Sequence, residues 1–149
     1  MTPALLIAPL AVEAVVIATD ELAFHRRRGL PRWERIGHPL DTATVVACFA
    51  VALALPPTTG ALQLYAVLAV FSCLFVTKDE RVHAARCSAA EHWLHALLFV
   101  LHPIVLAAVA LLWMQGATMI IGAQLALTVG FGMYQLLYWN LPRGRRTAA

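Results

Sequence analysis

The sequence predicts an all-α integral membrane bundle of about five transmembrane helices, forming a single domain over residues 1–149. Hydrophobic residues make up 61% of the chain and charged residues 13%, whereas a soluble domain is roughly 45–50% apolar. The apolar residues are gathered in long stretches, and the connections between them alternate between charged and uncharged. A chain of this kind folds in lipid, where helices satisfy the hydrogen bonds of their own backbone.

Five apolar stretches are the candidate spans. They cover residues 3–18, 42–55, 61–76, 95–114 and 117–138, against the roughly 17–25 residues that a helix needs to cross a bilayer. The first three are short and are expected to gain length from the polar residues beside them. The first stretch has no basic residue before it and is interrupted by Glu13, so we expect a retained helix rather than a cleaved signal.

The connections predict the orientation of the bundle. The charged connections 25–35 and 78–86 alternate with the uncharged connections 56–60 and 115–116, and a basic tail contains Arg143, Arg145 and Arg146. Because Lys and Arg are retained on the cytoplasmic side, the N-terminus is expected outside and the C-terminus inside, in an inner or plasma membrane. The basic loop 25–35 is expected to contact anionic lipid headgroups. Nucleic acid is not an expected partner, since the basic residues lie beside membrane spans.

Histidines and carboxylates gather at the cytoplasmic ends of the first four predicted helices. Uncompensated, such side chains cost roughly 2.5–3.5 kcal/mol each in lipid, so their position indicates a shared site. Many are spaced three or four residues apart, which places both members of a pair on one helix face. The predicted metal ligands are four such pairs, Glu21 with His25, His38 with Asp41, Glu80 with His83 and Glu91 with His95, together with His92.

Other charged residues near this face have a simpler interpretation. Interfacial side chains often do no more than solvate a helix end, and this reading has equal weight for Asp20, Glu34, Asp79 and Arg81. Glu34, in the basic loop, is expected to lie outside the metal site. Asp41 could also favour the dipole of a helix that starts near Pro39.

The ligand types narrow the choice of metal. Imidazole and carboxylate ligands without thiolate suit iron, manganese or zinc, and the three cysteines form no CxxC pair. The predicted ligands outnumber the four of a structural zinc site. Glu80 and His83 also have the Glu-x-x-His spacing of helical bundles that hold two iron or two manganese ions. We therefore expect a binuclear centre with two iron ions, and zinc or manganese as alternatives.

In residue classes and placement, residues 25–95 resemble the membrane-bound, histidine-rich di-iron oxygenases, the fatty-acid desaturases and hydroxylases. These enzymes hold their metals at the cytoplasmic ends of transmembrane helices. Their HxxxH and HxxHH boxes have no counterpart here, where the close histidine pair is His92-Trp93-Leu94-His95. The resemblance implies iron, oxygen chemistry, a lipid-soluble substrate and an electron-donor protein.

A second polar feature is predicted deeper in the membrane. Glu13 precedes Glu21 by eight residues and His102 follows His95 by seven, which places both about 10–12 Å further from the cytoplasmic face. Ionisable residues at that depth indicate function by default. Glu13 and His102 are therefore predicted to line a substrate or proton path, and a structural hydrogen bond between them is the equal alternative.

Three functions fit these features. The leading hypothesis is a membrane oxidoreductase that hydroxylates or desaturates a lipid or another lipid-soluble substrate, which enters from the bilayer. The second is a zinc-dependent hydrolase of lipid amides or esters, with Glu80 or Glu91 as the base. The third is a non-catalytic metal-binding subunit. The candidate catalytic residues are Glu80, Glu91, His102 and Glu13.

Overall fold

The computed structural model describes residues 2–141 of the chain, and in that range it is all-helical and contains no strand. The elements are α1 (Pro3–Thr19), the π-helix η1 (Asp20–His25), α2 (Arg26–Arg28), α3 (Arg32–Ala54), α4 (Thr59–Phe75), the 3₁₀-helix η2 (Val76–Asp79), α5 (Glu80–Arg86), α6 (Ala89–Met114) and α7 (Thr118–Asn140). The predicted all-α class is confirmed. The predicted basic tail with Arg143, Arg145 and Arg146 lies outside the described residues.

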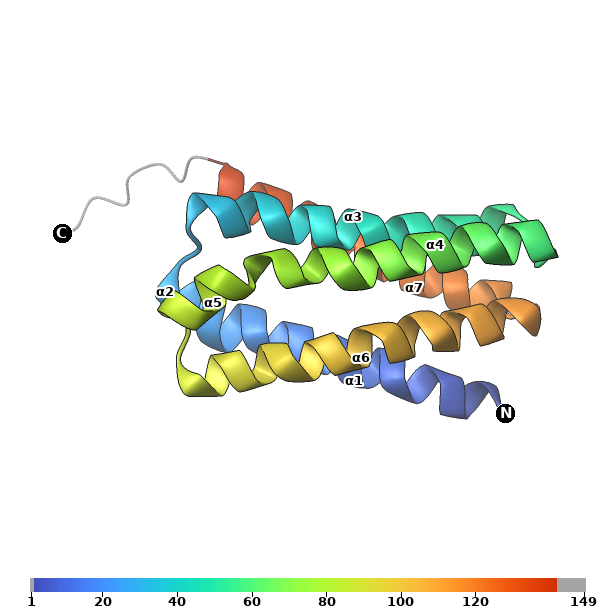
Figure 1. The fold of residues 1–149 in the computed structure, drawn as a ribbon, viewed down its shortest axis with the longest axis horizontal. Coiled ribbons are helices and arrows are strands. Elements are labelled where there is room, and N and C mark those ends of the chain that lie inside the picture. Colours follow the sequence, from blue (N-terminus) through green and yellow to red (C-terminus); the bar gives the residue numbers. More distant parts are fainter. Residues whose placement is uncertain (1, 142–149) are drawn as a thin grey trace.

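Four helical stretches in the described chain are long and apolar enough to cross a membrane, as expected of an integral membrane protein. They are Arg32–Ala54, Thr59–Arg86, Ala89–Met114 and Thr118–Asn140. Helix α1 has 17 residues, but its helical backbone continues without a break through η1 and α2. The long helices lie side by side, and the N-terminus and the end of α7 lie at opposite ends of the bundle (Figure 1).

Local sequence signals fix several helix ends. Thr58 precedes α4, and its hydroxyl oxygen accepts a hydrogen bond from the N–H of Ala61 at 3.4 Å. Ser88 precedes α6 and accepts in the same way from the N–H of Glu91 at 3.2 Å. Such caps satisfy a backbone donor that the helix leaves free. Gly29 ends α2 at a φ of 75°, which favours glycine because it has no Cβ.

Helix α3 begins ten residues before the start predicted from its apolar stretch. Its first residue is Arg32, after Pro31 at the cap. Pro39 lies inside the helix, so the expectation that a helix starts near Pro39 is wrong. The additional turns are polar, and they bring Glu34 to α2 and His38 to η1.

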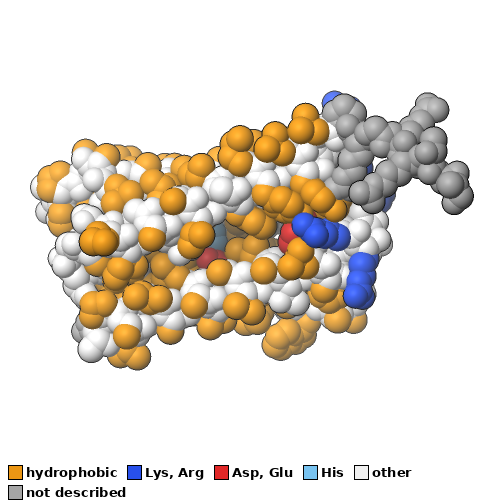
Figure 2. Space-filling model, turned by 180° about the vertical axis from the view of Figure 1, so that it is seen from behind, with side chains coloured by type: hydrophobic (Ala, Val, Ile, Leu, Met, Phe, Trp, Pro, Cys, Tyr) orange, Lys and Arg blue, Asp and Glu red, His pale blue; other side chains and the backbone are white. Residues whose placement is uncertain are grey.

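The long helices pack as an open ring. Helix α1 packs against α6, α6 against α4, α4 against α3, and α3 against α7, but α1 and α7 have little contact with each other. Figure 2 views the molecule from the side of α1 and α7, and it shows a hollow on that face with acidic and histidine atoms at its floor and hydrophobic side chains around it. The gap between α1 and α7 therefore gives access to the interior from the apolar flank of the bundle.

Apolar side chains fill the end of the bundle remote from the charges. Phe49, Leu112 and Ile121 are fully buried there. Tyr65 is also buried, and its hydroxyl donates a hydrogen bond to the carbonyl of Leu106 at 2.7 Å. This end is a packed core, so the polar chemistry of the described chain is concentrated at the other end.

Helices α3 and α7 approach each other closely at Gly132. A Cβ atom added there would lie 3.0 Å from Cγ2 of Thr42. The Thr42 hydroxyl donates to the side-chain oxygen of Gln135 at 2.8 Å, and a β-branched side chain is stiff, so this methyl group cannot turn away freely. A Cβ at Gly130, on the same helix, would meet nothing within 4 Å.

We expect Gly132→Ala to lower the free energy of unfolding by about 1–3 kcal/mol through overpacking. Gly130→Ala should leave it unchanged or raise it by up to about 1 kcal/mol, because alanine favours a helix. Thermal midpoints of both variants in one detergent measure the difference. Equal midpoints would contradict the close approach of α3 and α7.

Candidate metal centre

Four buried side chains lie close enough to hold one metal ion. They are Asp20, His25, Glu91 and His95, and one ligand atom from each lies within 4.8 Å of the others. They come from η1 and the first two turns of α6. Oδ2 of Asp20 lies 3.1 Å from Nε2 of His25 and 3.0 Å from Nε2 of His95. We call these four residues the ligand group; its two imidazoles and two carboxylates match the donors that iron, manganese and zinc accept.

The π-helix η1 explains how Asp20 joins the ligand group. Asp20 and His25 are five residues apart, which are not neighbours on an α-helix, but a π-helix pairs i with i+5. The same ring also reaches Glu21, since Nδ1 of His25 lies 3.4 Å from Oε2 of Glu21. Short π-helices occur often at functional sites, and this one lets a single imidazole contact two carboxylates.

The Glu21 carboxylate contacts three side chains, and one of them is the His25 ring that it orients. Its Oε1 accepts hydrogen bonds from the hydroxyl of Tyr134 and, at 3.1 Å, from the indole N–H of Trp139. Its other oxygen, Oε2, lies 3.4 Å from Nδ1 of His25. Glu21 is therefore a carboxylate that fixes the His25 ring and ties η1 to α7.

Arg28 balances the acidic charge of the site. Its Nη2 lies 3.0 Å from Oε2 of Glu34, and also 3.0 Å from Oε1 of Glu91. Arg28 thus orients Glu91 in the ligand group while it compensates the buried charge of Glu34.

Three carboxylates that could have solvated helix ends are instead buried. Asp20 is 5% exposed, Glu34 0% and Asp79 1%, so that interpretation is wrong for them. The prediction that Glu34 lies in a loop is wrong, because Glu34 lies in the first turn of α3 and binds Arg28, but Glu34 is not a member of the ligand group. Arg81 is exposed, as a solvating residue should be.

Two further histidines pack against the ligand group. The ring centroid of His83 lies 3.9 Å from that of His95, and the ring of His38 lies 4.9 Å from that of His25. Nε2 of His83 is 3.8 Å from Oε1 of Glu34, too far for a hydrogen bond. Because no hydrogen bond joins them, His83 and Glu34 are a second, smaller set of possible metal-binding side chains beside the ligand group.

Buried polar atoms without a hydrogen bond are concentrated at this end of the described chain. Leaving such an atom unsatisfied costs about 1–3 kcal/mol, and most buried polar groups avoid that cost. The unsatisfied atoms belong to Asp20, His25, Arg28, Glu34, Asp79, Glu80, His83 and His95. A metal ion would satisfy carboxylate oxygens and imidazole nitrogens, but not Nη1 of Arg28, which is a hydrogen-bond donor, so the carboxylate and histidine atoms among them fit a metal centre.

Three predicted ligands lie apart from the ligand group. Both carboxylate oxygens of Asp41 accept from Nζ of Lys78, at 2.6 and 2.7 Å. Glu80 and His92 pair with each other at 2.7 Å, and both side chains are 43% exposed. The spacing of the pairs in the sequence predicted one cluster. In the structure, however, Asp41 pairs with Lys78, and Glu80 pairs with His92.

A cavity of about 370 Å³ extends from the ligand group toward the middle of the bundle. Asp20, His25 and His95 line one end, and Glu13 and His102 lie further along it. Apolar side chains from α1, α3, α6 and α7 form much of its wall: Ile17, Val45, Phe49, Leu98, Phe99, Leu127 and Phe131. Its size is within the roughly 300–1,000 Å³ of small-molecule sites.

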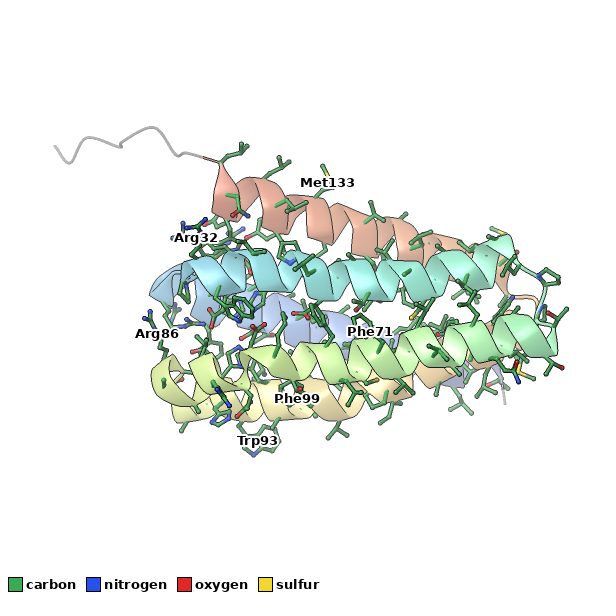
Figure 3. All side chains as sticks on the ribbon, turned by 45° about the horizontal axis from the view of Figure 1, so that its top comes forward. Arg32, Phe71, Arg86, Trp93, Phe99 and Met133 are labelled. Carbon is green, nitrogen blue, oxygen red and sulfur yellow. The ribbon has the colours of Figure 1, made fainter. Side chains whose placement is uncertain are left out.

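The polar and apolar parts of the bundle are clearly separated (Figure 3). Side-chain nitrogen and oxygen atoms crowd between the helices at the end marked by Arg32 and Arg86, and Trp93 points away from the bundle. Trp93 is 70% exposed, as expected of an amphipathic ring at a membrane surface. The ligand group thus lies inside the charged end rather than on its surface.

Comparison with known proteins leaves the site geometry as the basis for assigning a function. No protein-family model, curated protein or solved structure matches this chain. The resemblance to di-iron oxygenases therefore stays a prediction from residue classes and their placement.

Proposed function

We propose that this chain is a metal-dependent membrane oxidoreductase that acts on a lipid-soluble substrate. One observation carries the proposal: the buried ligand group forms the end of a cavity with largely apolar walls. A structural metal site is closed by its protein ligands, whereas a catalytic site keeps room for a reacting molecule. The opening between α1 and α7 would admit a substrate from the bilayer.

Two sets of residues would hold the metals. Asp20, His25, Glu91 and His95 would bind one ion, and His83 with Glu34 would contribute to a second. The unsatisfied nitrogens of His83 and the unsatisfied Oε1 of Glu34 support the second ion. Iron bound to histidine and carboxylate ligands would supply oxygen activation. Hydroxylation or desaturation of a carbon chain is the reaction class that we propose.

The surrounding residues would position the ligands and the substrate. Glu21 would keep the His25 ring oriented, and Arg28 would keep Glu91 in place, since such outer contacts tune ligand geometry and affinity. Phe99 and Phe131, from facing helices, would hold an apolar chain and exclude water from the cavity. An electron-donor protein would be expected to dock at the charged end, where the ligand group lies.

The proposed topology has five spans, with α1, η1 and α2 forming the first. The N-terminus would lie outside and the charged end in the cytoplasm. The described Lys and Arg residues support this, because they lie in α2, the start of α3 and the η2–α5 segment, which meet at one end of the bundle. Positive residues are retained on the cytoplasmic side.

Metal analysis of the purified chain tests the proposed function. We expect about two iron ions per chain, and an iron spectrum that shows magnetic coupling between them. Stoichiometric zinc, with no iron bound after anaerobic reconstitution, would overturn the oxidoreductase and favour a hydrolase. Folded protein that binds neither metal would overturn both.

A further inference from the structure

A second polar site lies in the cavity, away from the ligand group. Oε1 of Glu13 on α1 and Nδ1 of His102 on α6 are 3.4 Å apart, and the two side chains are 12% and 11% exposed. Both residues line the cavity. The 3.4 Å contact is longer than the usual 2.7–3.2 Å of a hydrogen bond, and both side chains face the cavity, so a third group can reach them.

The other ring nitrogen of His102 belongs to a chain of hydrogen bonds whose direction can be assigned. The Thr44 hydroxyl donates its proton to the backbone carbonyl of Asp41 at 2.7 Å. Oγ of Ser72 lies 2.6 Å from Oγ1 of Thr44, and a hydroxyl has a single proton to donate. Ser72 must therefore donate to Thr44, which leaves the Ser72 oxygen as an acceptor.

This direction fixes the tautomer of His102. Nε2 of His102 lies 2.9 Å from Oγ of Ser72, and because Ser72 is the acceptor there, Nε2 carries the proton. When the ring is neutral, Nδ1 therefore has a free lone pair, and it faces Glu13 at the cavity. The arrangement also excludes Ser72 as a nucleophile activated by His102, since the nitrogen that faces Ser72 is already protonated. Ser72 is instead a positioning residue.

Glu13 and Nδ1 of His102 both offer an acceptor to a hydroxyl group. A hydroxyl donates one hydrogen bond and accepts others, so it can donate to Nδ1 of His102 or to the Glu13 carboxylate. The neighbouring walls offer apolar surface from Phe49 and Phe99. A ligand that fits both the polar pair and the apolar walls is an apolar molecule with one hydroxyl group.

We infer that Glu13 and His102 form a binding site for the hydroxyl group of a long-chain alcohol or a similar lipid-soluble molecule. The chain of Ser72, Thr44 and the Asp41 carbonyl holds His102 in the tautomer that this site requires. His95 and His102 are seven residues apart on α6, two turns and about 10 Å along the helix. A bound alcohol would therefore have its hydroxyl group deep in the bundle and its chain within the cavity. The inference does not depend on any metal.

Nitrogen NMR of histidine tests this site in nanodiscs that contain the metal-free chain labelled with ¹⁵N-histidine. The signals of His102 are assigned from their loss in His102→Gln, or from their shift in Glu13→Gln if the first variant does not fold. We expect a neutral ring protonated at Nε2. Addition of 1-decanol should shift the Nδ1 signal, and addition of decane should not. A neutral ring protonated at Nδ1 would overturn the tautomer assignment, and equal responses to decanol and decane would overturn the hydroxyl site.

Two variants separate binding from structure. Glu13→Leu should weaken the decanol response at least about tenfold, as expected from loss of a hydrogen bond to a charged or acidic group. Ser72→Ala should leave a mixture of both tautomers. His92→Gln is the matched control, because His92 lies outside the cavity and this change should leave the decanol response intact. A Glu13→Leu chain that responds like the wild type would overturn the site. Since neither turnover nor metal is measured, that result would leave the proposed function untouched.

Discussion

His95→Ala is expected to lower the amount of bound transition metal at least about tenfold, and Asp20→Asn should act in the same direction. His95 and Asp20 both belong to the ligand group, and even residues that only support a metal ligand change affinity about 10–100-fold. The measurement is the metal content of purified, reconstituted protein after dialysis against a weak chelator. Thermal midpoints of the metal-free variants show whether each one folds.

The matched control is His92→Ala. His92 lies only three residues before His95, but it pairs with Glu80 at the surface. The His92→Ala variant should therefore bind as much metal as the wild type. Loss of metal in His92→Ala together with retention in His95→Ala would contradict the ligand group and return the site to the pairs predicted from spacing alone.

Arg28→Met is expected to destabilise the metal-free chain by about 3 kcal/mol. Removing one partner of a buried ion pair costs roughly 3–5 kcal/mol, and the Arg28 side chain is 18% exposed, which favours the lower end. The change leaves Glu34 and Glu91 without their shared cation. Unfolding in increasing denaturant, at one detergent concentration, measures the loss.

Two further variants make the Arg28 result specific. Arg27→Met, at the exposed neighbouring position, should change stability little, because an exposed charge contributes little. Combining Arg28→Met with Glu34→Gln should recover part of the lost stability, since the buried negative charge is removed with its partner. A double variant as unstable as the sum of both single variants would show that Arg28 does not compensate Glu34.

Hydropathy was sufficient to predict the class of fold, but it misplaced the start of α3. The polar turns before residue 42 look like a loop because their side chains cost free energy in lipid. In the structure Glu34 and His38 are accommodated inside the bundle, by Arg28 and by the ring of His25. These partners come from another helix, so a pattern within one segment cannot show them.

The α-helical period predicts only part of the ligand group. Glu91 and His95 are four residues apart on α6, and both are in the group. Asp20 was not predicted as a metal ligand, because residues five apart, like Asp20 and His25, share a face only in a π-helix. Asp41 was taken as a ligand because the sequence does not show that Lys78 reaches it. Helix period thus predicts which side chains share a face, but not which partner each one meets.

The π-helix η1 also sets the rotational phase of everything that precedes it. An α-helix turns by about 100° per residue, so a chain one residue shorter within η1 would turn α1 by about that angle relative to His25. Glu13 would then leave the cavity wall and face the surroundings of the bundle, while the partners of His102 on α4 would stay in place. The single wide turn at Asp20–His25 therefore acts as a spacer that keeps the ligand group and the distant Glu13 directed into the same cavity.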